Sequence, residues 1–261
     1  MGAMASTERH RQIVEAVRTE GRLGVGELAA LTGASEMTVR RDLEILAGQG
    51  VLERYRGGAR SLLLRGEEPP FALRATEGRA AKQRIAAEVA SLVADGETVV
   101  LDSGTTCLEV ARVLEQRRLT VMPLSLHAVN ALTGAPRLRL IVPGGEPRPG
   151  ELALTGPLTE SALAALRFDT AVLGCCGLTA ADGLTAYDLA EAAVKQAAIA
   201  SARRVIAVAD AAKFSRTALA YVAPAAALHA VVTDDRAPQE ELDALAAAGV
   251  DVRTVPSAPA G

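Results

Sequence analysis

The side chains best suited to chemistry follow a short apolar segment, Thr98–Leu101, as Asp102-Ser103-Gly104-Thr105-Thr106. The glycine permits close approach to the backbone, the hydroxyl groups can donate hydrogen bonds, and the start of a following helix favours an anion. The segment lacks the Gly-Lys-Ser/Thr ending of a nucleotide-binding loop. These residues predict an anion-binding turn between a strand and a helix, with an ordinary helix cap as the alternative.

Two adjacent arginines, Arg40 and Arg41, are the second group that could do chemistry. They follow Thr38 near the start of a predicted helix, where arginine can form a forked contact with guanine or grip a phosphate. Apolar residues at the spacing i, i+4, i+7 form the inward face of this helix: Val39, Leu43 and Leu46. The pattern indicates a helix that contacts DNA, and an ordinary helical hairpin with solvated arginines is the alternative.

A second predicted helix precedes the one that carries Arg40 and Arg41 and must position it. Val25, Leu28 and Leu31 recur at helical spacing and predict one inward-facing apolar stripe. Gly33 can end that helix in the left-handed conformation, and Ser35 is suited to cap the next helix.

A wing and a first helix complete the predicted domain, which covers residues 8–60. After Gly50, residues 51–58 suggest a β-hairpin with a basic edge that carries Arg54 and Arg56. Residues 8–19 place apolar side chains on one face and predict the first helix.

From Arg79 onward, apolar segments alternate with helical patterns. Continuous apolar strands between helices imply a mainly parallel sheet covered on both faces, with ligands at the carboxyl ends of strands. Strands are predicted at 98–101, 120–124, 138–142, 170–174, 205–209, 230–233 and 251–254, and helices at 79–94, 157–166, 189–202 and 238–248. Residues 61–75, with Gly66, Pro69 and Pro70, form a linker to this α/β domain of residues 76–255, so we expect an α+β two-domain chain.

The charge is unevenly distributed. The net charge of −3 does not by itself indicate nucleic-acid binding. Between residues 37 and 60, however, five arginines outnumber three carboxylates. A small basic surface on an acidic chain fits a DNA-binding domain joined to a domain with another task.

Cys107, Cys175 and Cys176 are the only cysteines. An odd number with two adjacent members favours reduced thiols in a cytoplasmic protein over a disulfide framework. No histidine has ligand spacing to them, so we expect small buried hydrophobic residues and neither metal nor cofactor. The first residues lack the pattern of a signal peptide and no apolar run is long enough for a bilayer, so no membrane partner is expected.

The segment SEMTVRRDLEILAGQGVLERYRGGA resembles the N-terminal winged helix-turn-helix of the DeoR family of bacterial transcription regulators. The family pattern has serine at the cap, Thr-x-Arg-Arg-Asp-Leu on the recognition helix, and a basic Gly-Gly wing. The resemblance implies that the DNA-contacting residues are Ser35, Thr38, Arg40, Arg41, Arg54 and Arg56.

The resemblance continues through most of the chain into the family's sensor domain, which is similar in fold to ribose-5-phosphate isomerase and glucosamine-6-phosphate deaminase. In those enzymes the Gly/Ser/Thr loop holds the substrate phosphate, and the family's regulators typically bind phosphorylated sugars or sugar alcohols. Only three of the 28 basic residues are lysines, and Lys82 and Lys213 match positions near that phosphate. The implied effector site comprises Lys82, Asp102, Ser103, Gly104, Thr105, Thr106, Gly144, Gly145, Cys176, Glu191, Lys195 and Lys213.

One position departs from the family. Where relatives often have Ala-Asp-Gly and the isomerases carry catalytic carboxylates, this chain has Cys175-Cys176-Gly177. The missing carboxylate counts against catalysis and against sugar recognition of the usual kind.

These observations predict a transcription regulator, a repressor, whose binding to double-stranded operator DNA is controlled by a phosphorylated small-molecule effector. A homo-oligomer is expected because paired half-sites raise affinity, with the alanine-rich residues 218–230 as apolar contact. The alternatives are a sugar-phosphate isomerase-like enzyme with an added DNA-binding domain and a ligand-independent DNA architectural protein.

Overall fold

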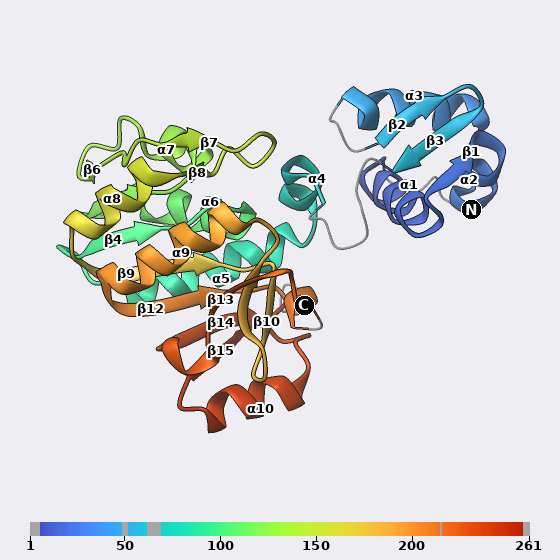
Figure 1. The fold of residues 1–261 in the computed structure, drawn as a ribbon. Helices are drawn as coiled ribbons and strands as arrows, with labels where there is room; N and C mark the ends of the chain where they lie inside the picture. Colours follow the sequence, from blue (N-terminus) through green and yellow to red (C-terminus); the bar gives the residue numbers. More distant parts are fainter. Residues whose placement is uncertain (1–5, 49–51, 62–68, 215, 258–261) are drawn as a thin grey trace. The chain divides into compact units, whose positions relative to one another are not determined.

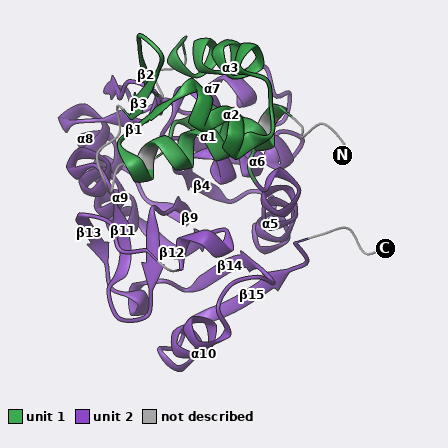
Figure 2. Cartoon of the chain, turned by 90° about the vertical axis from the view of Figure 1, so that its right-hand side faces the viewer, with its two compact units in different colours: residues 1–77 green, residues 78–261 purple. Residues whose placement is uncertain are grey.

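The computed structural model describes residues 6–48, 52–61, 69–214 and 216–257. The chain divides into two compact units, residues 1–77 and residues 78–261 (Figure 2). Each unit is described by itself.

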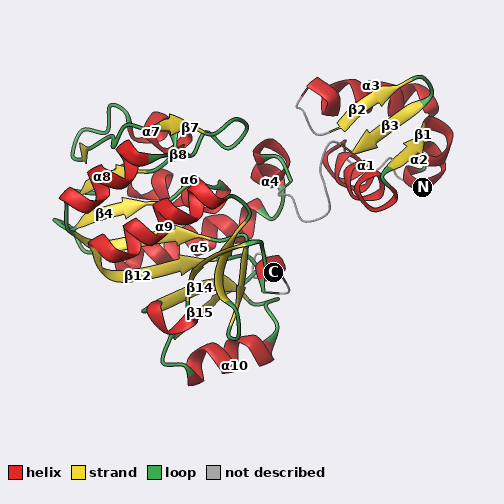
Figure 3. Cartoon of the chain, in the orientation of Figure 1, coloured by secondary structure: helices red, strands yellow, loops and turns green. Residues whose placement is uncertain are grey.

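Unit 1 is a winged helix-turn-helix. Its helices are α1 (Ser6–Glu20), α2 (Val25–Thr32), α3 (Glu36–Gly48) and α4 (Phe71–Thr76), and its strands are β1 (Arg22–Gly24), β2 (Leu52–Tyr55) and β3 (Gly58–Ser61). The strands form an antiparallel sheet in the order β1-β3-β2 (Figure 3). One aliphatic core joins the three main helices to the sheet, because α3 turns Val39, Leu43 and Leu46 inward as predicted.

The predicted stripe on α2 is wrong at its last member. Val25 and Leu28 are buried, but Leu31 is 53% exposed. The inward position belongs to Thr32, one full turn after Leu28, and its hydroxyl donates to the Leu28 carbonyl at 2.7 Å. Because this bond satisfies the Thr32 hydroxyl, a polar side chain can occupy the core position that was predicted for Leu31.

Two further features of unit 1 differ from the sequence prediction. The wing has a third strand, β1, which was not expected because three residues carry too little pattern. The predicted linker 61–75 includes Ser61 at the end of β3 and the helix α4. Val51, which began the predicted wing, and residues 62–68 lie outside the described residues.

Unit 2 is built on a parallel seven-stranded sheet in the order β15-β14-β12-β9-β4-β5-β6 (Figure 1). The strands are β4 (Thr98–Leu101), β5 (Thr120–Pro123), β6 (Arg139–Leu140), β9 (Phe168–Gly174), β12 (Ala202–Val208), β14 (Ala230–Asp234) and β15 (Asp251–Val255). All the pairings between them are parallel, which confirms the predicted mainly parallel sheet.

Helices cover both faces of this sheet, as the continuous apolar strands predicted. Val99 and Leu101 pack into one core with α5 (Arg79–Leu92), α6 (Thr105–Leu114) and α7 (Leu126–Leu132). Val100 points the other way, into a core shared with α8 (Pro157–Ala165), α9 (Leu189–Ser201) and α10 (Gln239–Ala247). Because side chains alternate between the two faces, successive residues of β4 are apolar and pack into both cores.

Short elements surround the sheet. An antiparallel sheet contains β10 (Gly177–Thr179), β11 (Gly183–Ala186) and β13 (Ala220–Ala223), and a small hairpin pairs β7 (Glu146–Pro147) with β8 (Leu154–Thr155). Two single-turn helices are η1 (Ala211–Lys213) and η2 (Ala225–Ala227). The predicted strand 138–142 is only two residues long.

The alanine-rich residues 218–230 include both buried and exposed positions. Ala220, Val222 and Ala223 are at most 5% exposed, and among their neighbours Leu219 and Tyr221 are the large apolar side chains exposed to solvent. Within the described ranges, no helix is long and apolar enough to span a bilayer.

Candidate DNA-binding and effector sites

The recognition helix α3 begins where the sequence placed its cap. The Ser35 hydroxyl oxygen accepts the Thr38 backbone N–H at 3.2 Å and lies 2.9 Å from the Thr38 hydroxyl. Capping of this kind fixes the first turn and stabilises the helix by about 1 kcal/mol. In this structure, Ser35 and Thr38 therefore stabilise the start of α3.

The four candidate arginines are all exposed. Arg40 pairs with Glu36 at 2.7 Å and Arg54 pairs with Glu44 at 2.9 Å. Among the described residues, Arg41 and Arg56 make no ion pair. Exposed pairs contribute little stability, so Arg40 and Arg54 can exchange a carboxylate for a DNA phosphate at low cost.

Asp42, one residue past these arginines, anchors α3 to α1. Its carboxylate accepts from Arg9 Nε at 2.5 Å and Arg9 Nη2 at 3.1 Å, and lies 2.8 Å from His10 Nε2. Burial tends to raise the pKa of Asp42, but the hydrogen bonds from Arg9 and His10 outweigh it and hold that pKa below its ordinary value. Sequence reasoning missed this role because the partners lie more than 30 residues away.

The wing depends on one glycine. A Cβ atom on Gly58 would lie 2.2 Å from the Leu23 carbonyl oxygen and 2.6 Å from the Tyr55 hydroxyl. The Leu23 backbone and the Tyr55 ring both lie close to Gly58 because β3 is the central strand, between β1 and β2. The second glycine of the wing motif is therefore a packing requirement.

In unit 2, the predicted anion-binding turn connects β4 to α6 (Figure 1). Gly104 has φ +100° and precedes the first helical residue, Thr105. In the described structure, the hydroxyl groups of Ser103, Thr105 and Thr106 have no hydrogen-bond partner. With the N–H groups of the first helical turn, these hydroxyls provide an arrangement of donors suited to an anion.

Asp102 and Lys195, both predicted effector contacts, form a buried ion pair with each other. Lys195 Nζ donates to Asp102 Oδ2 and, at 3.1 Å, to the Gly174 carbonyl. The Gly174 N–H in turn donates to Asp102 Oδ2 at 2.9 Å. Burial opposes the charge on Lys195, but Asp102 and Glu191 raise its pKa well above the ordinary value. This pair locks the turn to the end of β9.

Glu191 lies one turn before Lys195 on α9 and accepts from Arg148 Nε at 2.6 Å. The carboxylate is buried, and burial raises its pKa although Lys195 and Arg148 act in the opposite direction. Arg148 was not among the predicted residues, because its partner is 43 residues away and arginine is abundant in this chain.

The three cysteines are free and buried near the same strand ends, as predicted. Burial raises the pKa of Cys175 to about 12 and that of Cys107 well above its usual range. Thiols with such pKa values remain protonated and unreactive at neutral pH. Among the described residues, no cluster of histidine, cysteine or carboxylate side chains could hold a metal ion.

The remaining predicted effector residues have different surroundings. Gly145 has φ +102°, and a Cβ atom there would lie 2.1 Å from Thr159 Oγ1, while the Gly144 carbonyl accepts from that hydroxyl at 2.9 Å. These two glycines therefore pack against the start of α8. Lys82 is buried on α5, whereas Lys213 is half-buried in η1 and acts electrostatically on Cys175.

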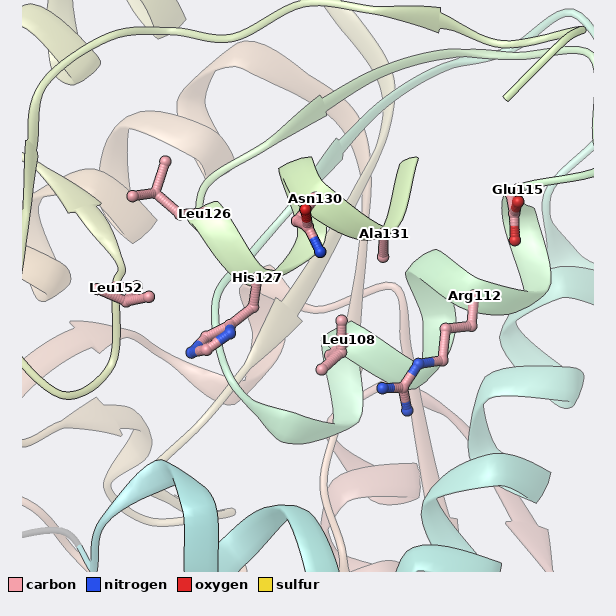
Figure 4. Close-up of a pocket in the computed structure, with 8 residues that line it drawn as sticks. All are labelled: Leu108, Arg112, Glu115, Leu126, His127, Asn130, Ala131 and Leu152. Carbon is pink, nitrogen blue, oxygen red and sulfur yellow. The ribbon is translucent and has the colours of Figure 1, made fainter. Parts of the chain in front are cut away.

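An open hollow of about 760 Å³ lies beside the outer faces of α6 and α7, lined in part by Leu108, His127, Asn130 and Leu152 (Figure 4). Burial lowers the pKa of His127, and the nearby Glu151 opposes that change. None of the predicted effector residues lines this hollow.

Comparison with known protein families identifies both units. Residues 9–63 match the model of the DeoR-like helix-turn-helix domain, and residues 77–235 match the model of the DeoR C terminal sensor domain.

Full-length relatives share this organisation. The chain is 36% identical to the transcriptional repressor AccR of Agrobacterium fabrum, over 88% of this chain and 90% of that protein. It is 32% identical to the glycerol-3-phosphate regulon repressor of Escherichia coli K12, over 93% and 96% of the two chains. It is 30% identical to a putative aga operon transcriptional repressor of Escherichia coli O157:H7, over 95% and 93%.

Among solved structures, ribose 5-phosphate isomerase A from Methanocaldococcus jannaschii matches with a TM-score of 0.40 and 16% identity, covering 53% of this chain and 55% of that one. The full-length sorbitol operon regulator SorC from Klebsiella pneumoniae matches with a TM-score of 0.35 and 12% identity, covering 78% and 89%. The three full-length relatives are all named as transcriptional or regulon repressors. The chain belongs to the DeoR family of transcription regulators, with a helix-turn-helix domain followed by a sensor domain.

Proposed function

We propose that this protein is a cytoplasmic repressor that binds operator DNA through unit 1 and releases it when unit 2 binds a phosphorylated small metabolite. The proposal of an effector site depends on one observation at the start of α6. The hydroxyl groups of Ser103, Thr105 and Thr106 there have no hydrogen-bond partner within the described part of the chain. A buried ion pair holds this turn in place, so its donors are ordered before a ligand arrives.

The proposal for DNA binding is supported by the exposed arginines of α3 and the wing. Arg41 is the arginine we expect to contact a base edge, because it lies on the recognition helix and no carboxylate competes for it among the described residues. Arg54 and Arg56 extend from the wing and are suited to phosphates.

The proposal of a phosphate-bearing effector is supported by the relatives. One of them is named for the glycerol-3-phosphate regulon. A phosphate dianion matches both the hydroxyl donors and the positive end of the α6 dipole. Lys213, half-buried near the end of β12, is the predicted partner charge.

A homo-oligomer is part of the proposal. One small winged helix contacts a short stretch of duplex, and joining two in one assembly raises the effective concentration of the second. A sedimentation measurement across concentrations checks this, and a monomer mass at every concentration, with and without DNA, would contradict it.

The test is a thermal-shift screen with five phosphates: inorganic phosphate, glycerol 3-phosphate, ribose 5-phosphate, fructose 6-phosphate and glucosamine 6-phosphate. We expect at least one to raise the midpoint of wild type and to have less effect on Thr105→Ala. Thr254→Ala, an exposed threonine on β15, is the matched control and should respond like wild type. Equal responses in all three proteins would place the effector elsewhere.

A further inference from the structure

Four charged side chains of unit 2 form a continuous series that leads from the surface to the anion-binding turn. Arg148 pairs with Glu191, Glu191 lies one helical turn from Lys195, and Lys195 pairs with Asp102. The exposed fraction of these side chains falls along the series, from 27% for Arg148 and 6% for Glu191 to 4% for Lys195 and 3% for Asp102.

The inner pair is committed to the fold. Lys195 donates to both the Asp102 carboxylate and the Gly174 carbonyl, and Asp102 also accepts the Gly174 N–H. A phosphate that took Lys195 from Asp102 would leave a buried carboxylate without its cation, which is strongly unfavourable. The outer pair is less constrained, because Lys195 still acts on the buried Glu191 carboxylate when Arg148 leaves it.

The backbone that carries Arg148 is held in place beside the segment that follows β5. Residues 148–153 form the tip of the β7–β8 hairpin, and Leu152 adopts the left-handed conformation with φ +52°. The tip is closed by the bond from Leu152 N to the Arg148 carbonyl at 2.8 Å. It is joined to the start of α7 by the bond from Leu126 N to the Leu152 carbonyl at 2.9 Å. A non-glycine residue in this conformation persists only where its surroundings fix it.

Arg148 lies among several carboxylates. The carboxylates of Glu191, Glu151 and Asp188 all act on its guanidinium, and the hydrogen bond in the structure goes to Glu191. Glu191 is also influenced by Lys195 and Asp102, so the pair lies within electrostatic reach of the anion-binding turn. A planar guanidinium can exchange one oxyanion for another with little change in geometry.

We infer that Arg148 is an effector-contacting residue, which leaves Glu191 and binds the oxyanion of the ligand held at Ser103–Thr106. This inference rests on the proposed function, since it adds a second contact to the same phosphate site. Glu191 then acts as a competitor for Arg148 and sets the affinity of the empty site for anions.

The experiment measures the affinity of the same five phosphates by calorimetry for Arg148→Gln and Glu191→Gln. Both changes remove the same ion pair, so a structural role would shift both affinities in one direction. The inference predicts opposite shifts: Arg148→Gln should weaken binding at least roughly tenfold, as for loss of a charge-assisted hydrogen bond. Glu191→Gln should tighten it, and Arg148→Lys should recover part of the lost affinity. Circular dichroism melts of the variants show whether they remain folded.

Thr105→Ala separates the two possible failures. If Thr105→Ala weakens binding but Arg148→Gln and Glu191→Gln shift affinity in the same direction or not at all, the role of Arg148 is wrong and the phosphate site remains. If no phosphate binds wild type saturably, or if Thr105→Ala binds as well as wild type, the proposed site fails and the inference fails with it.

Discussion

At the residue scale, Asp42 shows how a residue of the recognition helix can matter without touching DNA. It is 3% exposed and joined to both Arg9 and His10 of α1. Because α1 belongs to the domain core, this carboxylate fixes the angle at which α3 presents Arg40 and Arg41. Asp42 therefore orients the helix, while Arg40 and Arg41 beside it are the proposed DNA contacts.

Asp42→Asn should destabilise unit 1 by about 1–3 kcal/mol near neutral pH, the usual cost of weakening a buried charged hydrogen bond. The pKa of Asp42 is lower in the folded protein than its ordinary value of 3.8, so its contribution is present above that pH and is lost as pH falls through the lower folded value. The difference in stability between wild type and variant should therefore be constant from neutral pH to about pH 5 and shrink as the pH falls below about 4. Amide hydrogen exchange of α3 in both proteins measures this difference in stability. A difference that stays the same down to about pH 3 would contradict the role of Asp42.

Gly58→Ala should disrupt the wing, because the added methyl group would overlap the Leu23 carbonyl and the Tyr55 ring. Overpacking of this kind costs about 1–3 kcal/mol. Hydrogen exchange of the β3 amides should accelerate. Gly48→Ala is the matched control, since no atom lies within 4 Å of its Cβ position and its φ is not left-handed. Equal exchange in both variants would show that the wing tolerates the side chain.

At the element scale, we propose that α3 and the wing form one DNA-reading surface. Arg40→Ala with Arg41→Ala should reduce operator affinity, by about 1–3 kcal/mol for each base-specific contact that is lost. Loss of a phosphate contact, as expected for Arg56→Ala, should weaken binding to all sequences and lower the salt dependence. A mobility-shift titration at several salt concentrations distinguishes these outcomes. Unchanged affinity in the double variant would remove α3 from the DNA interface.

The elements that sequence predicted are those with strong local signals. Helix α3 was predicted from its cap residue, Ser35, and from the apolar spacing of Val39, Leu43 and Leu46. Continuous apolar runs predicted the parallel sheet with helices on both faces. Leu31 was misplaced because α2 is only eight residues long, and its last turn can bury either Leu31 or Thr32.

The candidate site was only partly predictable for a different reason. The turn at 102–106 is one local segment, so its residue types reveal it. The contacts of Arg148 with Glu191 and of Asp102 with Lys195 join residues 43 and 93 positions apart. Such contacts depend on how β7–β8 and α9 pack around the strand ends, and no local pattern encodes them.

At the scale of the whole molecule, regulation requires that the effector favour one DNA-binding state over the other. Reciprocity then requires operator DNA to change effector affinity by the same factor. We expect operator DNA to weaken binding of the effective phosphate. Calorimetry with and without a bound operator fragment checks this, and equal affinities would show that the two units are not coupled.

The most direct test of the central claim is the operator affinity of the full chain as the effective phosphate is added. A fragment selected by the protein from random-sequence DNA supplies the operator, and fluorescence anisotropy supplies the dissociation constant. We predict that the ligand weakens DNA binding by wild type and by Thr254→Ala. Thr105→Ala should bind the same DNA with unchanged affinity in the absence of ligand and should respond much less. Full release of Thr105→Ala at the same ligand concentration, or no response in wild type, would contradict control through the turn at Ser103–Thr106.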